Sequence, residues 1–206
     1  MGKAEKTALF LAGLAGLFWV LSKRTLAIPG FAMSRTAVLA LARKTVVDNF
    51  SDVDFEMAAA IAIVESDGNP LALRYEPGLG DASIGLMQTL LGTARWLAAD
   101  MGYERYGVPG LADLLDADKS MYFGAAYLQW LRHWNGVRRS DEWIVMAYNA
   151  GPGNVGTGAA EAYLAKYRIA RAGGDPHASP PPEPGTGGAA LSDDPFFSGD
   201  DFVGGA

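Results

Sequence analysis

Residues 57–64 of this chain are Met-Ala-Ala-Ala-Ile-Ala-Ile-Val, and Glu65-Ser66 follow them directly. Eight uncharged residues in a row give a helix that is apolar on every side, and such a helix is buried in the middle of a domain. The acidic residues within 52–54 supply a start signal, and Asp67-Gly68-Asn69-Pro70 supply a stop. The sequence therefore predicts a buried central helix that ends in a carboxyl group.

Glu65 is the residue of this helix that could carry chemistry. At helical spacing it shares a face with Ala58, Ile61 and Ala62. It also lies at the C-terminal end, where the helix dipole is negative. Both features disfavour the carboxylate, so they should raise the pKa of Glu65 toward the range that a general acid needs near neutrality. The alternative interpretation is a surface glutamate at the point where its helix emerges.

Five further helices are indicated by apolar periodicity and capping residues, so the predicted fold class is mainly α. The Gly-rich stretch 71–85 lacks helical periodicity, and we expect a loop or a small β hairpin there. The predicted helices cover residues 34–49, about 89–101, about 116–134, 140–149 and 159–171.

The composition excludes several kinds of chemistry. The chain has 206 residues with no Cys and only two His, His133 and His177. Disulfides, thiol nucleophiles and thiolate metal sites are ruled out, and hardly any ligands remain for a transition metal. The formal net charge is −6 and no basic tract is present, which argues against a nucleic-acid partner. We therefore expect no metal ion and no cofactor.

The two ends of the chain differ in composition from the middle. Residues 7–22 carry no charge and have lysines on both sides, which is compatible with a membrane anchor, a cleaved signal peptide or a soluble core helix. Residues 172–206 hold six acidic residues, six Pro and eight Gly but no Lys or Arg, so a disordered tail is expected. The predicted organisation is an anchor or signal segment with a linker over 1–33, one domain over 34–171, and the tail.

The ends also bear on location and partners. Residues 7–22 are consistent with a membrane-anchored protein and with an exported one. The sequence does not decide between the cell envelope and a plastid as its location. In the tail, residues 193–202 place phenylalanines among aspartates. This composition suits a short docking motif for a partner, or else a tail that only keeps the protein soluble.

Three motifs occur in a recognisable order: Glu65-Ser66 with Asn69-Pro70, then Gly85-Leu86-Met87-Gln88, then Ala147-Tyr148-Asn149-Ala150-Gly151. Together they resemble the transglycosylase SLT domain of soluble lytic transglycosylases, in the goose-type lysozyme-like superfamily. The similarity extends over residues 55–156, and residues 120–131 look most like plant and green-algal members. The resemblance implies a lysozyme-like, mainly α domain.

The resemblance also implies roles for individual residues. Glu65 is then the single catalytic acid and base, and Ser66 steadies its carboxyl group or the substrate. The turn of residues 85–88 lines the floor of the cleft, where Met87 touches the sugar by apolar contact and Gln88 by a hydrogen bond. The Tyr148 hydroxyl is the expected direct partner of Glu65. The implied substrate-binding residues are Ser66, Gly85, Leu86, Met87, Gln88, Tyr148 and Asn149.

The implied reaction cleaves the glycan strands of peptidoglycan without water. Glu65 protonates the glycosidic oxygen between N-acetylmuramic acid and N-acetylglucosamine, and the substrate's acetamido group stabilises the developing cation. The Glu65 carboxylate then takes the proton of the C6 hydroxyl, which closes a 1,6-anhydro ring. Two alternatives remain: a muramidase that hydrolyses the same bond, with Asp81 or else Glu76 activating water, and an inactive glycan-binding or membrane scaffold protein.

The chain departs from the family pattern at Arg74. This arginine follows Ala72-Leu73, where a small residue is usual in the family. It could be an ordinary surface arginine, or it could meet an anionic group such as a muramyl lactate or a peptide carboxylate. The sequence leaves both interpretations open.

Overall fold

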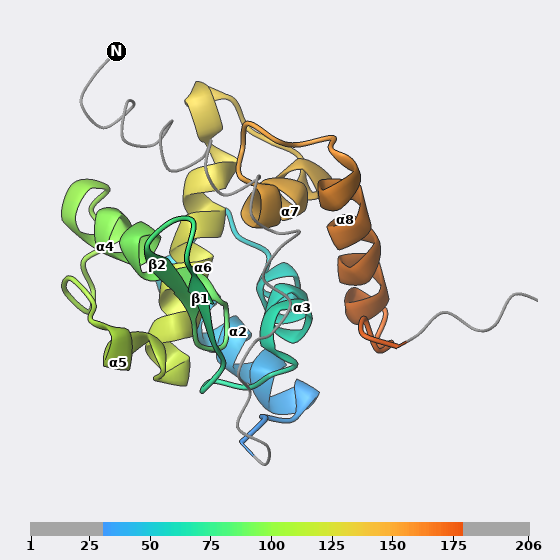
Figure 1. The fold of residues 1–206 in the computed structure, drawn as a ribbon, viewed down its shortest axis with the longest axis horizontal. Coiled ribbons are helices and arrows are strands. Elements are labelled where there is room, and N and C mark those ends of the chain that lie inside the picture. Colours follow the sequence, from blue (N-terminus) through green and yellow to red (C-terminus); the bar gives the residue numbers. More distant parts are fainter. Residues whose placement is uncertain (1–30, 179–206) are drawn as a thin grey trace, which may run out of the picture.

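Helix α3, Phe55–Ser66, is the centre around which the other elements pack. All residues from Met57 to Val64 are buried, as the sequence predicts. The Asp54 side chain accepts a hydrogen bond from the Glu56 amide at the start of the helix, and Asp67 ends it in a left-handed conformation. The computed structural model describes residues 31–178, and Figure 1 shows α3 in the middle of this part.

Three long helices cover α3. They are α2 (Arg35–Asn49), α6 (Ala117–Arg132) and α8 (Gly158–Arg171). Side chains of Ser34, Asp116 and Thr157 cap their first turns, so these helices begin where a polar residue can bind a free backbone amide. The mainly α prediction is therefore confirmed.

Shorter helices complete the fold. Helix α4 spans Leu91–Asp100, α5 spans Leu111–Leu114 and α7 spans Asp141–Ala150, while a 3-10 turn, η1, covers Trp134–Gly136. Helix α7 packs against both α6 and α8. In Figure 1, α4 and α8 lie on opposite sides of the molecule, with α3 and a small sheet between them. The single turn of α5 is too short to produce a periodic sequence signal.

The Gly-rich stretch forms a β hairpin, one of the two structures expected for it. Strand β1, Leu73–Glu76, pairs antiparallel with β2, Asp81–Ile84, and β3, Thr89–Leu90, extends the sheet beside β2. The register places Arg74 opposite Ser83. The predicted helix start at Thr89 is wrong, because this residue is paired in β3 and α4 begins two residues later.

The turn between β2 and β3 is held by very close contacts. Gly85 has a φ of +77°, and a Cβ atom there would lie 1.8 Å from the Leu114 carbonyl oxygen. On α6, a Cβ atom at Gly124 would lie 2.6 Å from the side chain of Met87. Glycine at both positions therefore lets the turn pack directly onto α5 and α6.

The ends of the chain are described only in part. The predicted anchor or signal segment of residues 7–22, and the tail beyond Ala178, lie outside the described residues. Residues 172–178 lie against the domain, since Arg35 Nη2 donates to the Gly174 carbonyl at 2.7 Å and the His177 ring lies 3.4 Å from the Ile63 carbonyl. Within residues 31–178, no helix has the length and apolar content that a membrane span requires.

Replacing Gly85 with alanine should lower the free energy of unfolding by about 3 kcal/mol. The left-handed backbone should account for about 1 kcal/mol of this loss, and the overlap with Leu114 for about 2 kcal/mol. Gly80→Ala is the matched control, because Gly80 also has a positive φ of 61° but a Cβ atom there meets nothing within 4 Å. It should lose only about 1 kcal/mol. Urea unfolding measures both losses, and equal losses would contradict a tight contact at Gly85.

Candidate active site

Glu65 lies near the C-terminal end of α3, where its carboxyl group meets the last helix of the domain. Its Oε1 atom accepts a hydrogen bond of 2.7 Å from the hydroxyl of Tyr163 on α8. Tyr163 is itself buried, at 2 % exposure, whereas Glu65 is half-buried. The two residues are 98 positions apart in the sequence. The packing of α8 on α3 therefore gives the carboxyl group a fixed partner.

The surroundings of Glu65 act on its charge in opposite directions. Burial raises its pKa, and the negative charge of Glu76 adds to the rise. The hydrogen bond from Tyr163 lowers the pKa, as do the nearby cations Arg74 and Lys166. Burial is the largest influence, so the pKa of Glu65 lies above its ordinary value. This is the direction that the sequence analysis predicts.

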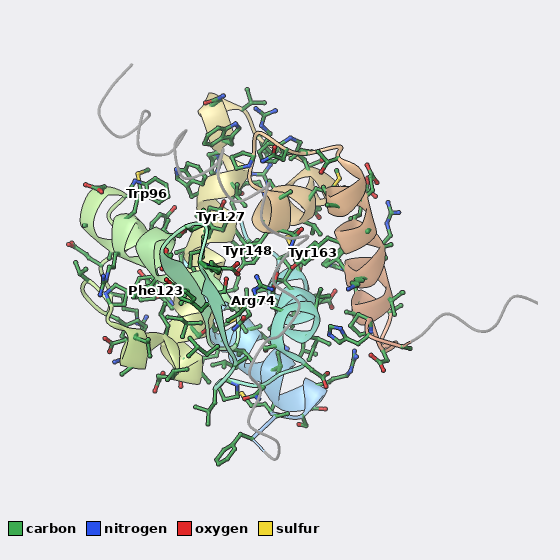
Figure 2. The ribbon with its side chains drawn as sticks, in the orientation of Figure 1. Arg74, Trp96, Phe123, Tyr127, Tyr148 and Tyr163 are labelled. Atoms are coloured by element: carbon green, nitrogen blue, oxygen red, sulfur yellow. The ribbon has the colours of Figure 1, made fainter. Side chains whose placement is uncertain are left out.

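Tyr148 does not make the contact expected of it. Its hydroxyl donates to the carbonyl of Met87 at 2.8 Å and lies 3.5 Å from Thr89 Oγ1. The expectation that Tyr148 is the direct partner of Glu65 is corrected, because Tyr163 holds that position. Tyr148 is still near enough for the Glu65 charge to raise the pKa of its hydroxyl, after the larger effect of burial. Figure 2 shows Arg74, Tyr148 and Tyr163 together at the centre of the molecule.

Ser66 links α3 to the turn of residues 85–88. Its hydroxyl lies 2.8 Å from the Leu86 carbonyl and 3.1 Å from the Ala62 carbonyl, and it donates to both. No hydrogen bond joins it to the Glu65 carboxyl group within the described part of the chain. The observed position therefore supports a role in holding the turn beside Glu65.

The side chains of the turn face inward, contrary to expectation. Leu86 and Met87 have no exposed surface, and Gln88 is 6 % exposed. The Gln88 amide donates to the carbonyls of Ala72 and Gly85, at 3.0 and 2.9 Å. The Gln88 Oε1 atom is buried and has no hydrogen-bond partner among residues 31–178. Contacts of Met87 and Gln88 with sugar stay a prediction.

Asn149 follows Tyr148 on α7 and is half-buried. Its Oδ1 atom is buried and has no hydrogen-bond partner among residues 31–178. Asn149 therefore lies on the helix that binds the turn through Tyr148, but no hydrogen bond joins Asn149 to Glu65 in the described part of the chain.

The two carboxylates considered as hydrolytic helpers are both occupied. Asp81 Oδ2 accepts from the Gly92 amide at 2.9 Å, in the first turn of α4, and Oδ1 accepts from the Ala82 amide at 2.7 Å. Asp81 thus binds the N-terminal end of a helix, a structural role that the sequence did not indicate. Its role in activating water stays a prediction of the muramidase alternative. Glu76 is buried at 6 % exposure and accepts hydrogen bonds from Arg74 and Ser83.

A metal ion would need a cluster of suitable ligands. Among residues 31–178, no group of three or more His, Cys, Asp or Glu side chains is placed to hold one.

The variant Tyr163→Phe should raise the pKa of Glu65 further above its ordinary value. The lost hydrogen bond stabilises the carboxylate, so its removal favours the protonated form. Tyr148→Phe is the matched control and should give a smaller rise, because its hydroxyl donates to Met87 instead. Carbon-detected NMR titration of the glutamate carboxyl groups measures both. An unchanged Glu65 pKa in Tyr163→Phe would contradict the assigned hydrogen bond.

The chain is similar to known proteins in two comparisons. The sequence model of the family described as "Transglycosylase SLT domain" matches residues 48–170, more than half of the 206-residue chain. Among solved structures, the 70 kDa soluble lytic transglycosylase from Escherichia coli matches with a TM-score of 0.47 and 21% sequence identity, and the match covers 66% of this chain and 25% of that protein. No curated protein sequence matches. The match over residues 48–170 shows that this chain belongs to the transglycosylase SLT domain family.

Proposed function

We propose that this protein is a lytic transglycosylase that cleaves the β-1,4 bond between N-acetylmuramic acid and N-acetylglucosamine in peptidoglycan. One observation carries the proposal: the Glu65 carboxyl group has a raised pKa and a fixed hydrogen-bond partner, while the two other carboxylates considered for catalysis are tied to protein groups. A single acid beside which both candidate partners, Asp81 and Glu76, have structural roles suits a reaction in which the substrate supplies its own nucleophile. Membership in the transglycosylase SLT domain family supports the same assignment.

Glu65 acts first as an acid. A raised pKa keeps a larger fraction of the carboxyl group protonated near neutral pH. The proton passes to the glycosidic oxygen, the bond from this oxygen to C1 of the muramic acid breaks, and the electron pair stays on the oxygen. Positive charge then develops at C1, as in other glycosidic cleavages.

Glu65 acts next as a base. The C6 hydroxyl oxygen of the same sugar forms a bond to C1, and its proton passes to the Glu65 carboxylate, which restores the acid. Between the two proton transfers Glu65 is a carboxylate, and the Tyr163 hydroxyl can donate a hydrogen bond to it. This hydrogen bond keeps the carboxylate in one orientation. Tyr163 is therefore a positioning residue in this proposal.

The remaining site residues act through the turn. Ser66 and Tyr148 bind the carbonyls of Leu86 and Met87, and Gly85 allows the turn to sit against α5. We assign these residues to holding the turn in place beside Glu65. We assign Gln88 and Asn149 to the same structural role. Gln88 closes the turn by donating to the Gly85 carbonyl, and Asn149 follows Tyr148 on α7.

Hydrolysis of the same bond is the less favoured reaction. An inverting glycosidase holds a second carboxylate about 6.5–9.5 Å from the acid, where it activates water. Asp81 uses both oxygens on backbone amides, and Glu76 is paired with Arg74. Each carboxylate thus already has a structural role, which favours the transglycosylase reaction over hydrolysis.

The variant Glu65→Gln should reduce release of 1,6-anhydro products by at least about 100-fold, because general acid and base catalysis contributes roughly 10²–10⁴ in rate. Asp81→Asn should leave the rate nearly unchanged, since asparagine can still accept from the Gly92 amide. The full-length protein is incubated with peptidoglycan, and mass spectrometry of the products distinguishes anhydro ends from hydrolysed ends. Hydrolysed ends alone, or a large loss in Asp81→Asn, would support a muramidase instead.

We further propose that residues 7–22 anchor the protein to a membrane. The uncharged run with lysines on both sides supports this assignment, with Trp19 suited to the interface. The full-length protein should then sediment with membranes, and N-terminal sequencing should find residues 7–22 still present. A soluble protein whose chain begins beyond residue 22 would instead support a cleaved signal peptide.

A further inference from the structure

The β1–β2 hairpin directs three polar side chains to one face. Residues two apart on a strand point the same way, so Arg74 and Glu76 share a face of β1. The antiparallel register places Ser83 of β2 opposite Arg74, on that same face. The local β structure alone therefore brings a cation, an anion and a hydroxyl together.

These three side chains form a connected cluster. Arg74 Nε donates to Glu76 Oε1 at 2.5 Å, and the Ser83 hydroxyl donates to the same oxygen at 3.1 Å. Arg74 Nη2 lies 3.5 Å from Ser83 Oγ. Glu76 and Ser83 are buried, so they fix the orientation of the guanidinium group from the protein side.

One edge of the guanidinium group stays available. The Arg74 side chain keeps 23% of its surface exposed, against 8% for Glu76. Within residues 31–178, the Nη1 atom of Arg74 has no hydrogen-bond partner. A guanidinium group held along one edge with a free second edge is suited to bind a planar carboxylate through two parallel hydrogen bonds.

Hydrogen bonds connect the hairpin to the end of α3 that carries Glu65. The Ala72 carbonyl, two residues before Arg74, accepts from the Gly85 amide at 2.7 Å, and the Ser66 hydroxyl donates to the Leu86 carbonyl of the same turn. Figure 2 draws Arg74 in the same central part of the molecule as Tyr148 and Tyr163. The positive charge of Arg74 also acts on the pKa of the Glu65 carboxyl group and of the Tyr163 hydroxyl, so Arg74 belongs to the charged surroundings of the proposed catalytic group.

We infer that Arg74 is a specificity-determining residue that binds a carboxylate of the glycan substrate beside Glu65. This inference rests on the proposed function, because it concerns the substrate of the same site. Two carboxylates of peptidoglycan have the required chemistry. Strands without peptide stems expose the lactyl carboxylate of muramic acid, whereas intact strands carry that group as an amide and offer the carboxylates of the stem peptide.

The competing explanation is an ion pair that only stabilises the hairpin. The two explanations differ in what they predict for the substrate. A structural ion pair would affect cleavage of every substrate alike, whereas a binding residue affects only substrates that carry the carboxylate. The loss of a binding residue should also raise mainly KM and leave kcat little changed, since the interaction with the carboxylate is already made in the ground state.

The experiment compares stem-free glycan strands with the same strands after conversion of their lactyl carboxylates to amides. Arg74→Gln should raise KM about tenfold on the carboxylate strands, which is the weaker end of the range for hydrogen bonds to charged groups, and leave kcat little changed. On the amidated strands, its KM should equal that of the wild-type protein. Equal effects of Arg74→Gln on a carboxylate substrate and on its amidated counterpart would overturn the inference, and so would the absence of an effect on every substrate of this comparison and the next.

A second pair of substrates identifies the source of the carboxylate. Intact peptidoglycan is compared with intact peptidoglycan whose stem carboxylates have been amidated. An effect of Arg74→Gln confined to stem-free strands identifies the lactyl group, and an effect confined to intact strands identifies the stem peptide. Either result supports the inference. If the wild-type protein releases no anhydro product from any of these substrates, the proposed function fails, which is a separate outcome.

Two further variants test whether a loss of folding explains the result, and thermal unfolding measures the stability of each variant. Arg74→Gln leaves the buried Glu76 carboxylate without its cation, which destabilises the protein. The double variant Arg74→Gln with Glu76→Gln removes both charges and so avoids this cost. It should lose the discrimination between carboxylate and amidated strands as fully as Arg74→Gln does. Glu76→Gln alone retains the arginine and should still discriminate. Retained discrimination in the double variant would overturn the inference even if Arg74→Gln failed to fold.

Discussion

The carboxyl group of Glu65 sits at the end of a helix whose preceding eight residues are all buried, and this burial opposes its ionisation. The hydrogen bond from Tyr163 acts in the other direction because it stabilises the carboxylate. The packing of α8 on α3 therefore both buries Glu65 and limits the rise in its pKa, a combination that suits the proposed role as acid and then base.

The Gly-Leu-Met-Gln turn is held in place through its backbone. The Ser66 hydroxyl of α3 binds the Leu86 carbonyl, the Ser120 hydroxyl of α6 accepts from the Met87 amide, and the Tyr148 hydroxyl of α7 donates to the Met87 carbonyl. Three helices thus bind two adjacent residues of one turn. The side chains of the turn are then free to fill the core, which explains why they are buried.

The sequence predicts those features of the fold that local signals determine. The buried α3 follows from its uncharged run, and helices α2 and α7 begin after Ser34 and Ser140, as their capping residues indicate. Tyr163 was missed because it lies 98 residues from Glu65, in an amphipathic helix where a tyrosine normally indicates only a core position. The capping role of Asp81 could not be predicted, because its partner, the Gly92 amide, is placed only once β2 and α4 pack together. The rise in the Glu65 pKa was predictable because the apolar face that causes it belongs to the same helix.

The hairpin shows how a site can gain an oriented cation with little change in its overall electrostatics. Arg74 lowers the pKa of Glu65 and Glu76 raises it, so the pair has opposing effects on the acid. A lone arginine at this position would favour the carboxylate and weaken Glu65 as a proton donor. Because Glu76 binds one edge of the guanidinium group and balances its charge, the other edge can point at an incoming anion while the acid keeps its raised pKa. The strand spacing that places Glu76 two residues after Arg74 therefore orients the guanidinium group and opposes its effect on the pKa of Glu65.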